Sequence, residues 1–123
     1  MATQLDLVSL YAALAVTACA SVPQPKAADT AVQQLKNYAL STCIADGGLG
    51  GETAKDAAAA ARGYLEFGDL PLEAHTEATL LGRQFLAREY KSSTGEKMVV
   101  MKCIDFYNSP ELDKLALRYS HEP

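Results

Sequence analysis

The chain has 123 residues and a mass of 13.1 kDa, which limits it to a single domain. Hydrophobic residues make up 49% of it, enough for one core, and the 7% of aromatic residues, with no tryptophan, predict an aliphatic, alanine-rich interior. The formal net charge of −4 and the pI of about 5.1 exclude the basic surface that nucleic-acid binding requires.

The first predicted element is an export signal over residues 1–20. The apolar run from Leu7 to Ala18 has the length of a signal-peptide core and is too short to span a bilayer. It is followed by Cys19, which is either lipidated, as in a bacterial lipoprotein, or removed with the signal when cleavage follows Ala20. Contact with a membrane would depend on that lipid. Because no Lys or Arg precedes the apolar run, an amphipathic or buried first helix stays open as the alternative.

Residues 21–27 are expected to form a tether, because Pro23 and Pro25 keep their neighbours extended. From there on, apolar residues recur at three-to-four spacing, and no alternating β-branched segment occurs, so the sequence predicts helices and no strands. We therefore predict an all-α fold, a compact bundle of about five helices, for the domain at residues 28–123. The helices are expected at residues 28–45, 53–67, 70–90, 96–107 and 110–119.

Local signals support several of these boundaries. A glycine of the pair Gly47–Gly48 can adopt the left-handed conformation that ends the first helix, and Asp69 is a candidate cap for the third helix. Ser109 followed by Pro110 is a strong start signal for the fifth helix. The apolar side of the third helix is expected to carry Leu72, Leu80, Leu81, Phe85 and Leu86.

Two cysteines lie on predicted apolar helix stripes. Cys43 follows Leu35 and Ala39 in the first helix, and Cys103 stands between Val99 and Phe106 in the fourth. If Cys19 is removed or lipidated, the exported domain holds an even pair of cysteines, which predicts one disulfide bracing the bundle. The alternative is two reduced, buried cysteines, because free cysteine is among the most buried residue types.

The sequence offers no catalytic, metal-binding or cofactor-binding constellation. His75 and His121 are the only histidines; His75 is interpreted as a partly exposed helix residue, and bridged sulfurs could not serve it as nucleophiles. There is no CxxC, no His pair one helical turn apart and no calcium loop. The glycines at 47–51 lack the preceding strand and the lysine of a phosphate-binding loop, and Glu73 and Glu77 are typical of a solvated helix face. We therefore expect no cofactor and no enzyme activity.

Three stretches carry a family resemblance: residues 38–45 (YALSTCIA), 85–90 (FLAREY) and 102–113 (KCIDFYNSPELD). With the alanine-rich second helix, they make residues 30–120 resemble the type VI secretion amidase immunity family, in particular the immunity partners of the fourth class of secreted peptidoglycan amidases. The resemblance implies an all-helical protein exported to the periplasm. It also implies a homodimer that blocks the cleft of a cognate papain-like Cys-His amidase in a two-to-two complex. Such amidases cut the stem peptide between D-glutamate and diaminopimelate.

With this resemblance, the polar loop between the third and fourth helices becomes the candidate for the element that enters the amidase. The loop comprises Lys91, Ser92, Ser93, Thr94, Gly95, Glu96 and Lys97. The exposed side of the third helix, with Glu73, Glu77 and Arg83, is the candidate for the remaining contact surface. A plain solvated connector is the alternative interpretation of the loop.

Two other functional classes stay open on the sequence. A periplasmic all-helical adaptor or chaperone-like protein would need a broad apolar or Met-rich groove, and the chain has only three methionines. A small hydrolase is disfavoured by the scarcity of histidine.

Overall fold

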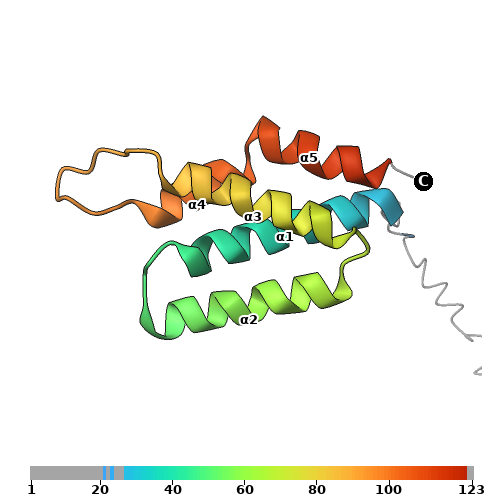
Figure 1. Ribbon diagram of the computed structural model, residues 1–123, viewed down its shortest axis with the longest axis horizontal. Coiled ribbons are helices and arrows are strands. Elements are labelled where there is room, and N and C mark those ends of the chain that lie inside the picture. Colours follow the sequence, from blue (N-terminus) through green and yellow to red (C-terminus); the bar gives the residue numbers. More distant parts are fainter. Residues whose placement is uncertain (1–20, 22, 24–26, 122–123) are drawn as a thin grey trace, which may run out of the picture.

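The computed structural model describes residues 21, 23 and 27–121 of the chain (Figure 1). The predicted signal peptide, Cys19 and most of the predicted tether lie outside the described residues. Within these residues the chain forms α-helices and no strand, so the predicted all-α bundle is confirmed. The helices are α1 Ala27–Asp46, α2 Gly51–Phe67, α3 Leu72–Leu86, α4 Val99–Tyr107 and α5 Pro110–Ser120.

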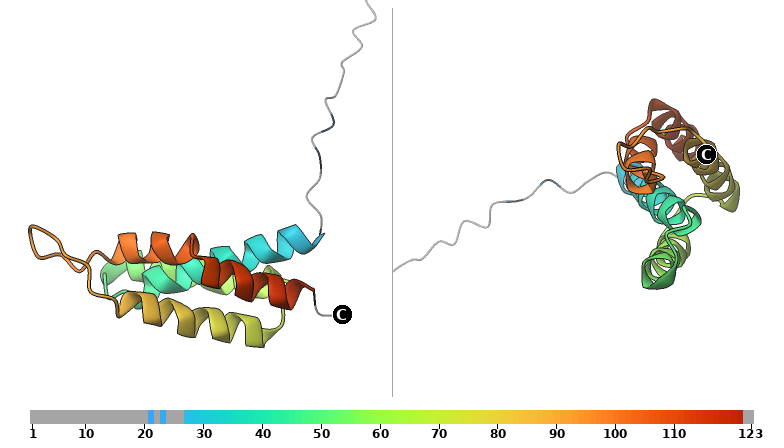
Figure 2. Two further views of the ribbon diagram at one scale, coloured as in Figure 1. Left: turned by 90° about the horizontal axis from the view of Figure 1, so that it is seen from above. Right: turned by 90° about the vertical axis from the view of Figure 1, so that its left-hand side faces the viewer.

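Helix α1 is the centre of the bundle. It packs against α2, α3, α4 and α5, whereas α2 packs chiefly against α1 (Figures 1 and 2). The α1–α2 turn and the α3–α4 connection lie at the same end of the molecule, and the C-terminus lies at the other (Figure 1). Segments far apart in the sequence therefore meet at the end that carries these two connections.

The core is built from small and medium-sized apolar side chains of α1, α3, α4 and α5. The rings of Phe85 and Phe106 are its largest pair, with centroids 5.2 Å apart. Helix α2 buries a single side chain, Ala61. The buried core cluster consists of Leu35, Ala39, Cys43, Ala74, Ala78, Phe85, Val99, Cys103, Phe106, Leu112, Leu115 and Ala116.

A disulfide joins Cys43 of α1 to Cys103 of α4, with the two Cα atoms 5.7 Å apart, which confirms the predicted cross-link. Both residues are fully surrounded by core side chains. The bridge closes a loop of 60 residues, for which chain entropy alone gives a stabilisation of roughly 4 kcal/mol. It fixes the central helix to the helix that follows the α3–α4 connection.

The third and fourth helices are shorter than predicted. Helix α3 ends at Leu86 instead of residue 90, because Lys102 Nζ donates a hydrogen bond of 3.1 Å to the Leu86 carbonyl, which a longer helix would have used itself. Helix α4 begins at Val99 instead of residue 96, because Met98 has a left-handed backbone with φ 54°. The N-cap of α3 is Pro71, and no side chain caps the helix. The prediction that Asp69 caps α3 is therefore wrong.

The buried side of α3 also differs from the prediction. Leu72 and Leu80 are 65% and 52% exposed, whereas Ala74, Ala78 and Gly82 are buried. Small residues let the α3 backbone approach its neighbours closely, and this advantage outweighs the larger apolar area of the leucines. The position of Phe85 and the partial burial of Leu81 and Leu86 agree with the prediction.

Candidate functional site

The longest connection among the described helices runs from Ala87 to Met98, between α3 and α4. It projects beyond the ends of the helices (Figures 1 and 2). The predicted contact residues 91–97 all lie in it, and apart from half-buried Ser92 they are exposed. We call this connection the α3–α4 loop.

The tip of the α3–α4 loop is held by its own hydrogen bonds. The hydroxyls of Ser92 and Thr94 both donate to the Glu96 carboxylate, and the Thr94 backbone N–H donates to Ser92 Oγ over 3.2 Å. The hydroxyl of Ser92, followed by that of Thr94, holds the pKa of the Glu96 carboxyl below its usual range. Gly95 supplies the positive φ of 86° that the turn needs. The tip of the loop therefore forms a hydrogen-bonded turn.

The base of the loop is fixed to α4. The Tyr90 hydroxyl donates to the Asp105 carboxylate, an interaction that raises the pKa of Tyr90. Lys102, only 8% exposed, holds the end of α3 through Leu86 and lies 5.7 Å from the centre of the Tyr90 ring. The outgoing end of the projecting segment is therefore anchored to the cross-linked helix α4, and its returning end continues directly into that helix.

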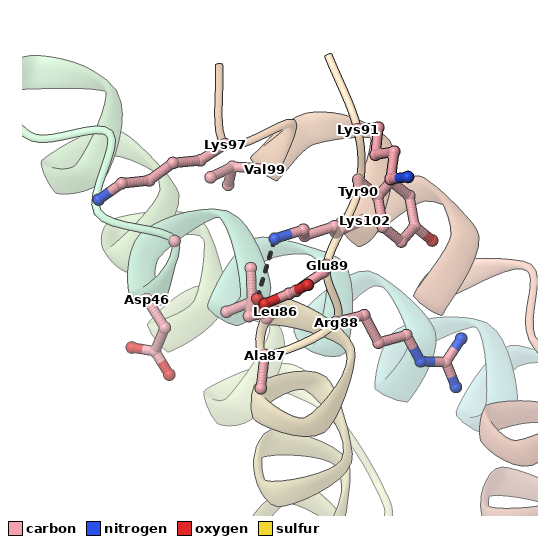
Figure 3. Close-up of a pocket in the computed structure, with 11 residues that line it drawn as sticks. Asp46, Leu86, Ala87, Arg88, Glu89, Tyr90, Lys91, Lys97, Val99 and Lys102 are labelled. Carbon is pink, nitrogen blue, oxygen red and sulfur yellow. Dashed lines mark hydrogen bonds between the residues drawn. The ribbon is translucent and has the colours of Figure 1, made fainter. Parts of the chain in front are cut away.

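Two hollows flank the base of the loop. The first, of about 540 Å³, lies between the end of α1, the outgoing limb of the loop and the start of α4 (Figure 3). The second, of about 490 Å³, lies between the α1–α2 turn and the returning limb, and Leu49, Val100 and Met101 give it an apolar lining. These three side chains are 45–52% exposed. The loop end of the molecule thus offers a polar and an apolar concavity side by side.

The structure separates the three residues predicted on the third helix. Arg83 lies near the loop end, where its Nε is 3.3 Å from Asp46 Oδ2. Glu77 faces α5: its carboxylate pairs with Arg118 and accepts a hydrogen bond of 2.6 Å from the Tyr119 hydroxyl. Glu73 is exposed in the first turn of α3, about 15 Å along the helix axis from Arg83. Of the three, Arg83 is the one that the fold brings to the same end as the α3–α4 loop.

Sequence reasoning missed two buried polar residues. His75 was expected to be partly exposed, and this is wrong: it is 2% exposed, and its Nδ1 lies 3.0 Å from the Pro71 carbonyl. Lys102 was not singled out, although it shares the helical stripe of Val99, Cys103 and Phe106. A lysine on such a stripe is a signal that could have drawn attention to the pocket.

No group of three or more His, Cys, Asp or Glu side chains within the described ranges is arranged to hold a metal ion. Among these same residues, no helix has both the length and the apolar character that crossing a membrane requires.

Comparison with known proteins identifies the family. The family model for the type VI secretion system amidase immunity protein matches residues 33–116. Among solved structures, the Tae4–Tai4 effector–immunity system of Salmonella typhimurium is 32% identical, with a TM-score of 0.67 over 77% of this chain and 96% of that chain.

Two more structures share the fold. One, from work on type VI-secreted toxins and self-resistance proteins of Serratia marcescens, is 25% identical over 80% of this chain and 85% of that chain, with a TM-score of 0.65. The Tae4–Tai4 complex of Enterobacter cloacae is 22% identical over 77% and 98% of the two chains, with a TM-score of 0.63. No curated protein matches the chain significantly. Since the family model covers most of the sequence, the chain belongs to the type VI secretion system amidase immunity proteins and is not an enzyme.

Proposed function

We propose that the protein binds a cognate type VI secreted peptidoglycan amidase and inhibits it by occluding the active-site cleft with the α3–α4 loop. The observation that carries this is the projecting loop itself, which has a hydrogen-bonded tip, an outgoing end anchored to α4 and a returning end that continues into that helix. Blocking a cleft needs no catalytic group. It needs a surface that loses little conformational freedom on binding, and a preformed turn on a cross-linked frame has this property.

The family supports a proposal for the nature of the partner and for the compartment. We expect a papain-like amidase with a Cys-His pair, which cuts the peptide stem of peptidoglycan. That substrate lies in the periplasm, so the immunity protein must act there after export directed by residues 1–20. The Cys43–Cys103 disulfide supports this, because disulfides persist in oxidising compartments. Lipidation at Cys19 would add an anchor on the membrane.

We further propose a homodimer that binds two amidase molecules. Support comes from the outward side of α4, where Val100, Met101 and Ile104 are each about half exposed although they are apolar. Exposed apolar side chains that gather on one helix face favour contact with another protein. Light scattering of the purified protein, with Ile104→Glu as the disruptive variant, tests this assembly. A monomeric wild-type protein would contradict it.

The inhibition itself is tested by peptidoglycan hydrolysis with the purified amidase. An excess of the wild-type protein should abolish release of fragments. Deletion of Ser92 to Gly95 should weaken inhibition strongly while leaving the melting temperature nearly unchanged, since these residues lie outside the core. Lys55→Ala, on the exposed side of α2, is the matched control and should inhibit fully. Unimpeded hydrolysis in the presence of excess wild-type protein would refute the proposal.

A further inference from the structure

The pocket on the outgoing side of the α3–α4 loop has a charge opposite to that of the chain. Its lining includes four cationic side chains, Arg88, Lys91, Lys97 and Lys102, although the chain as a whole has a net charge of −4. Figure 3 shows the Lys102 ammonium pointing into the middle, with Lys97 on one side and Lys91 and Arg88 on the other. The lining also contains Asp46 and Glu89, so cations outnumber acids by four to two, and such an excess of one sign concentrates its field in a hollow.

All but one of the acidic groups near this pocket are engaged by other side chains. Asp46 of the lining pairs with Arg83, the Asp105 carboxylate accepts from Tyr90, and the Glu96 carboxylate is bonded within the loop tip. Glu89 is the remaining acid of the lining. In the part of the chain that the structure describes, the ion pairs within 4.0 Å involve Lys36, Lys55, Arg83 and Arg118 and none of the four pocket cations.

Lys102 is the distinctive member of this set. More than nine-tenths of the residue is buried, yet its ammonium has a single hydrogen bond within the described residues, to the Leu86 carbonyl. An ammonium carries three donors, and burying one with no carboxylate within 4.0 Å among the described residues is costly. The pocket is therefore built to gain free energy when an anion enters it.

We propose that this pocket receives a carboxylate side chain, Asp or Glu, of the amidase effector. The inference rests on the proposed function, because the pocket adjoins the base of the loop that we place in the amidase cleft. An amidase that surrounds the loop also covers this hollow. The carboxylate would accept hydrogen bonds from the ammonium of Lys102 and further ones from Lys97 or Arg88. The loop would then supply occlusion, and the pocket would supply recognition of the cognate partner.

The test compares affinities of the amidase for full-length variants by calorimetry at low and high NaCl concentration. Lys102→Met keeps an unbranched side chain that is one atom shorter and removes its charge. We expect it to weaken binding by a factor of roughly 30 or more at low salt and to reduce the salt dependence. Lys97→Met, which removes an exposed cation of the same pocket, should weaken binding less, and Lys55→Met on α2 should change neither quantity.

Because Lys102→Met also removes the bond to Leu86, its melting temperature is measured beside the affinity. Lys97 does not bond to the Leu86 carbonyl. The variant Lys97→Met therefore keeps the inference testable if Lys102→Met unfolds. Asp→Asn and Glu→Gln substitutions are made one at a time in the amidase. One of them should weaken binding to the wild-type protein but have no effect on binding to Lys102→Met or Lys97→Met, and a double-mutant cycle measures this coupling.

Two outcomes would overturn this inference and leave the proposed function standing. One is tight, equally salt-dependent binding by both pocket variants. The other is a loss of self-association in Lys102→Met with unchanged affinity for the amidase, which would assign the pocket to a second copy of this chain. If the wild-type protein does not bind the amidase at all, the proposed function fails and this inference fails with it.

Discussion

Gly82 of α3 lies directly against the ring of Phe106. A Cβ atom at position 82 would be 3.0 Å from Phe106 Cε1, and Phe106 has no exposed surface into which it could shift. The Phe85 ring also packs against it, with the two centroids 5.2 Å apart. The close contact of α3 with α4 therefore depends on the missing side chain.

Gly82→Ala should accordingly lower the free energy of unfolding by about 1 kcal/mol, since overpacking outweighs the better helix propensity of alanine. Gly63→Ala is the matched control, because a Cβ there meets no atom within 4 Å. It should stabilise the protein by up to about 1 kcal/mol. Thermal unfolding of Gly82→Ala and Gly63→Ala measures the two changes in stability. Equal gains in both variants would show that the contact at Gly82 is looser than the structure indicates.

Removal of the disulfide should lower stability more than it lowers affinity for the amidase. For the double variant Cys43→Ala, Cys103→Ala we expect a loss of about 2–5 kcal/mol, because the bridge no longer restricts the unfolded chain. Denaturant unfolding measures the loss. A reductant should destabilise the wild-type protein and leave the double variant unaffected, and an insensitive wild type would argue against the bridge.

His75 should tolerate an aromatic replacement and no small one. Its ring packs edge-on against Tyr38 at 4.7 Å, and its Nε2 has no partner in the described part of the chain. His75→Phe keeps a flat aromatic ring, although a slightly larger one, and the Pro71 carbonyl still accepts the Ala74 N–H at 3.1 Å, so we expect a change within about 1 kcal/mol.

His75→Ala, in contrast, opens a cavity in the same place and should cost about 2–4 kcal/mol. Both values come from denaturant unfolding of the purified variants. If the two substitutions were equally destabilising, the hydrogen bond of the ring, and not its packing, would be the main contribution of His75.

The loop tip should respond to acid. Because the folded-state pKa of Glu96 is lowered, its contribution to the turn is complete above the ordinary Glu pKa of about 4.3 and disappears as the pH falls through the lowered value. NMR titration of the Glu96 carboxyl should find that lowered pKa, and the double variant Ser92→Ala, Thr94→Ala should bring it back toward the usual range.

In the double variant Ser92→Ala, Thr94→Ala the loop tip loses its hydrogen bonds to Glu96, so binding to the amidase has to order it. We therefore expect affinity for the amidase to fall a few-fold while the melting temperature stays unchanged, since the altered side chains lie outside the core. Unaltered affinity would mean that the turn forms no part of the contact.

Features encoded by neighbouring residues could be predicted from the sequence. The stripe of Leu35, Ala39 and Cys43 is buried as expected, and Ser109 caps α5 by accepting the Leu112 N–H at 3.2 Å. Hydrophobic spacing and capping chemistry act within one or two helical turns, so a single segment contains the information. The disulfide could be predicted because both cysteines lie on apolar helix stripes.

Features made by distant residues could not be predicted in this way. The end of α3 depends on Lys102, which follows Leu86 by 16 residues. The burial of His75 likewise depends on Tyr38 of another helix. The candidate contact loop was predicted from its polar composition together with the family resemblance, whereas the cationic pocket beside it required the fold.

The one-sided attachment of α2 has a consequence for the dynamics of the bundle. With Ala61 as its single buried side chain and α1 as its chief neighbour, α2 can detach while the bridged core stays intact. Its backbone amides should then exchange with deuterium earlier than those of α1 and α4. Local opening at that edge would leave the ends of the α3–α4 loop in place.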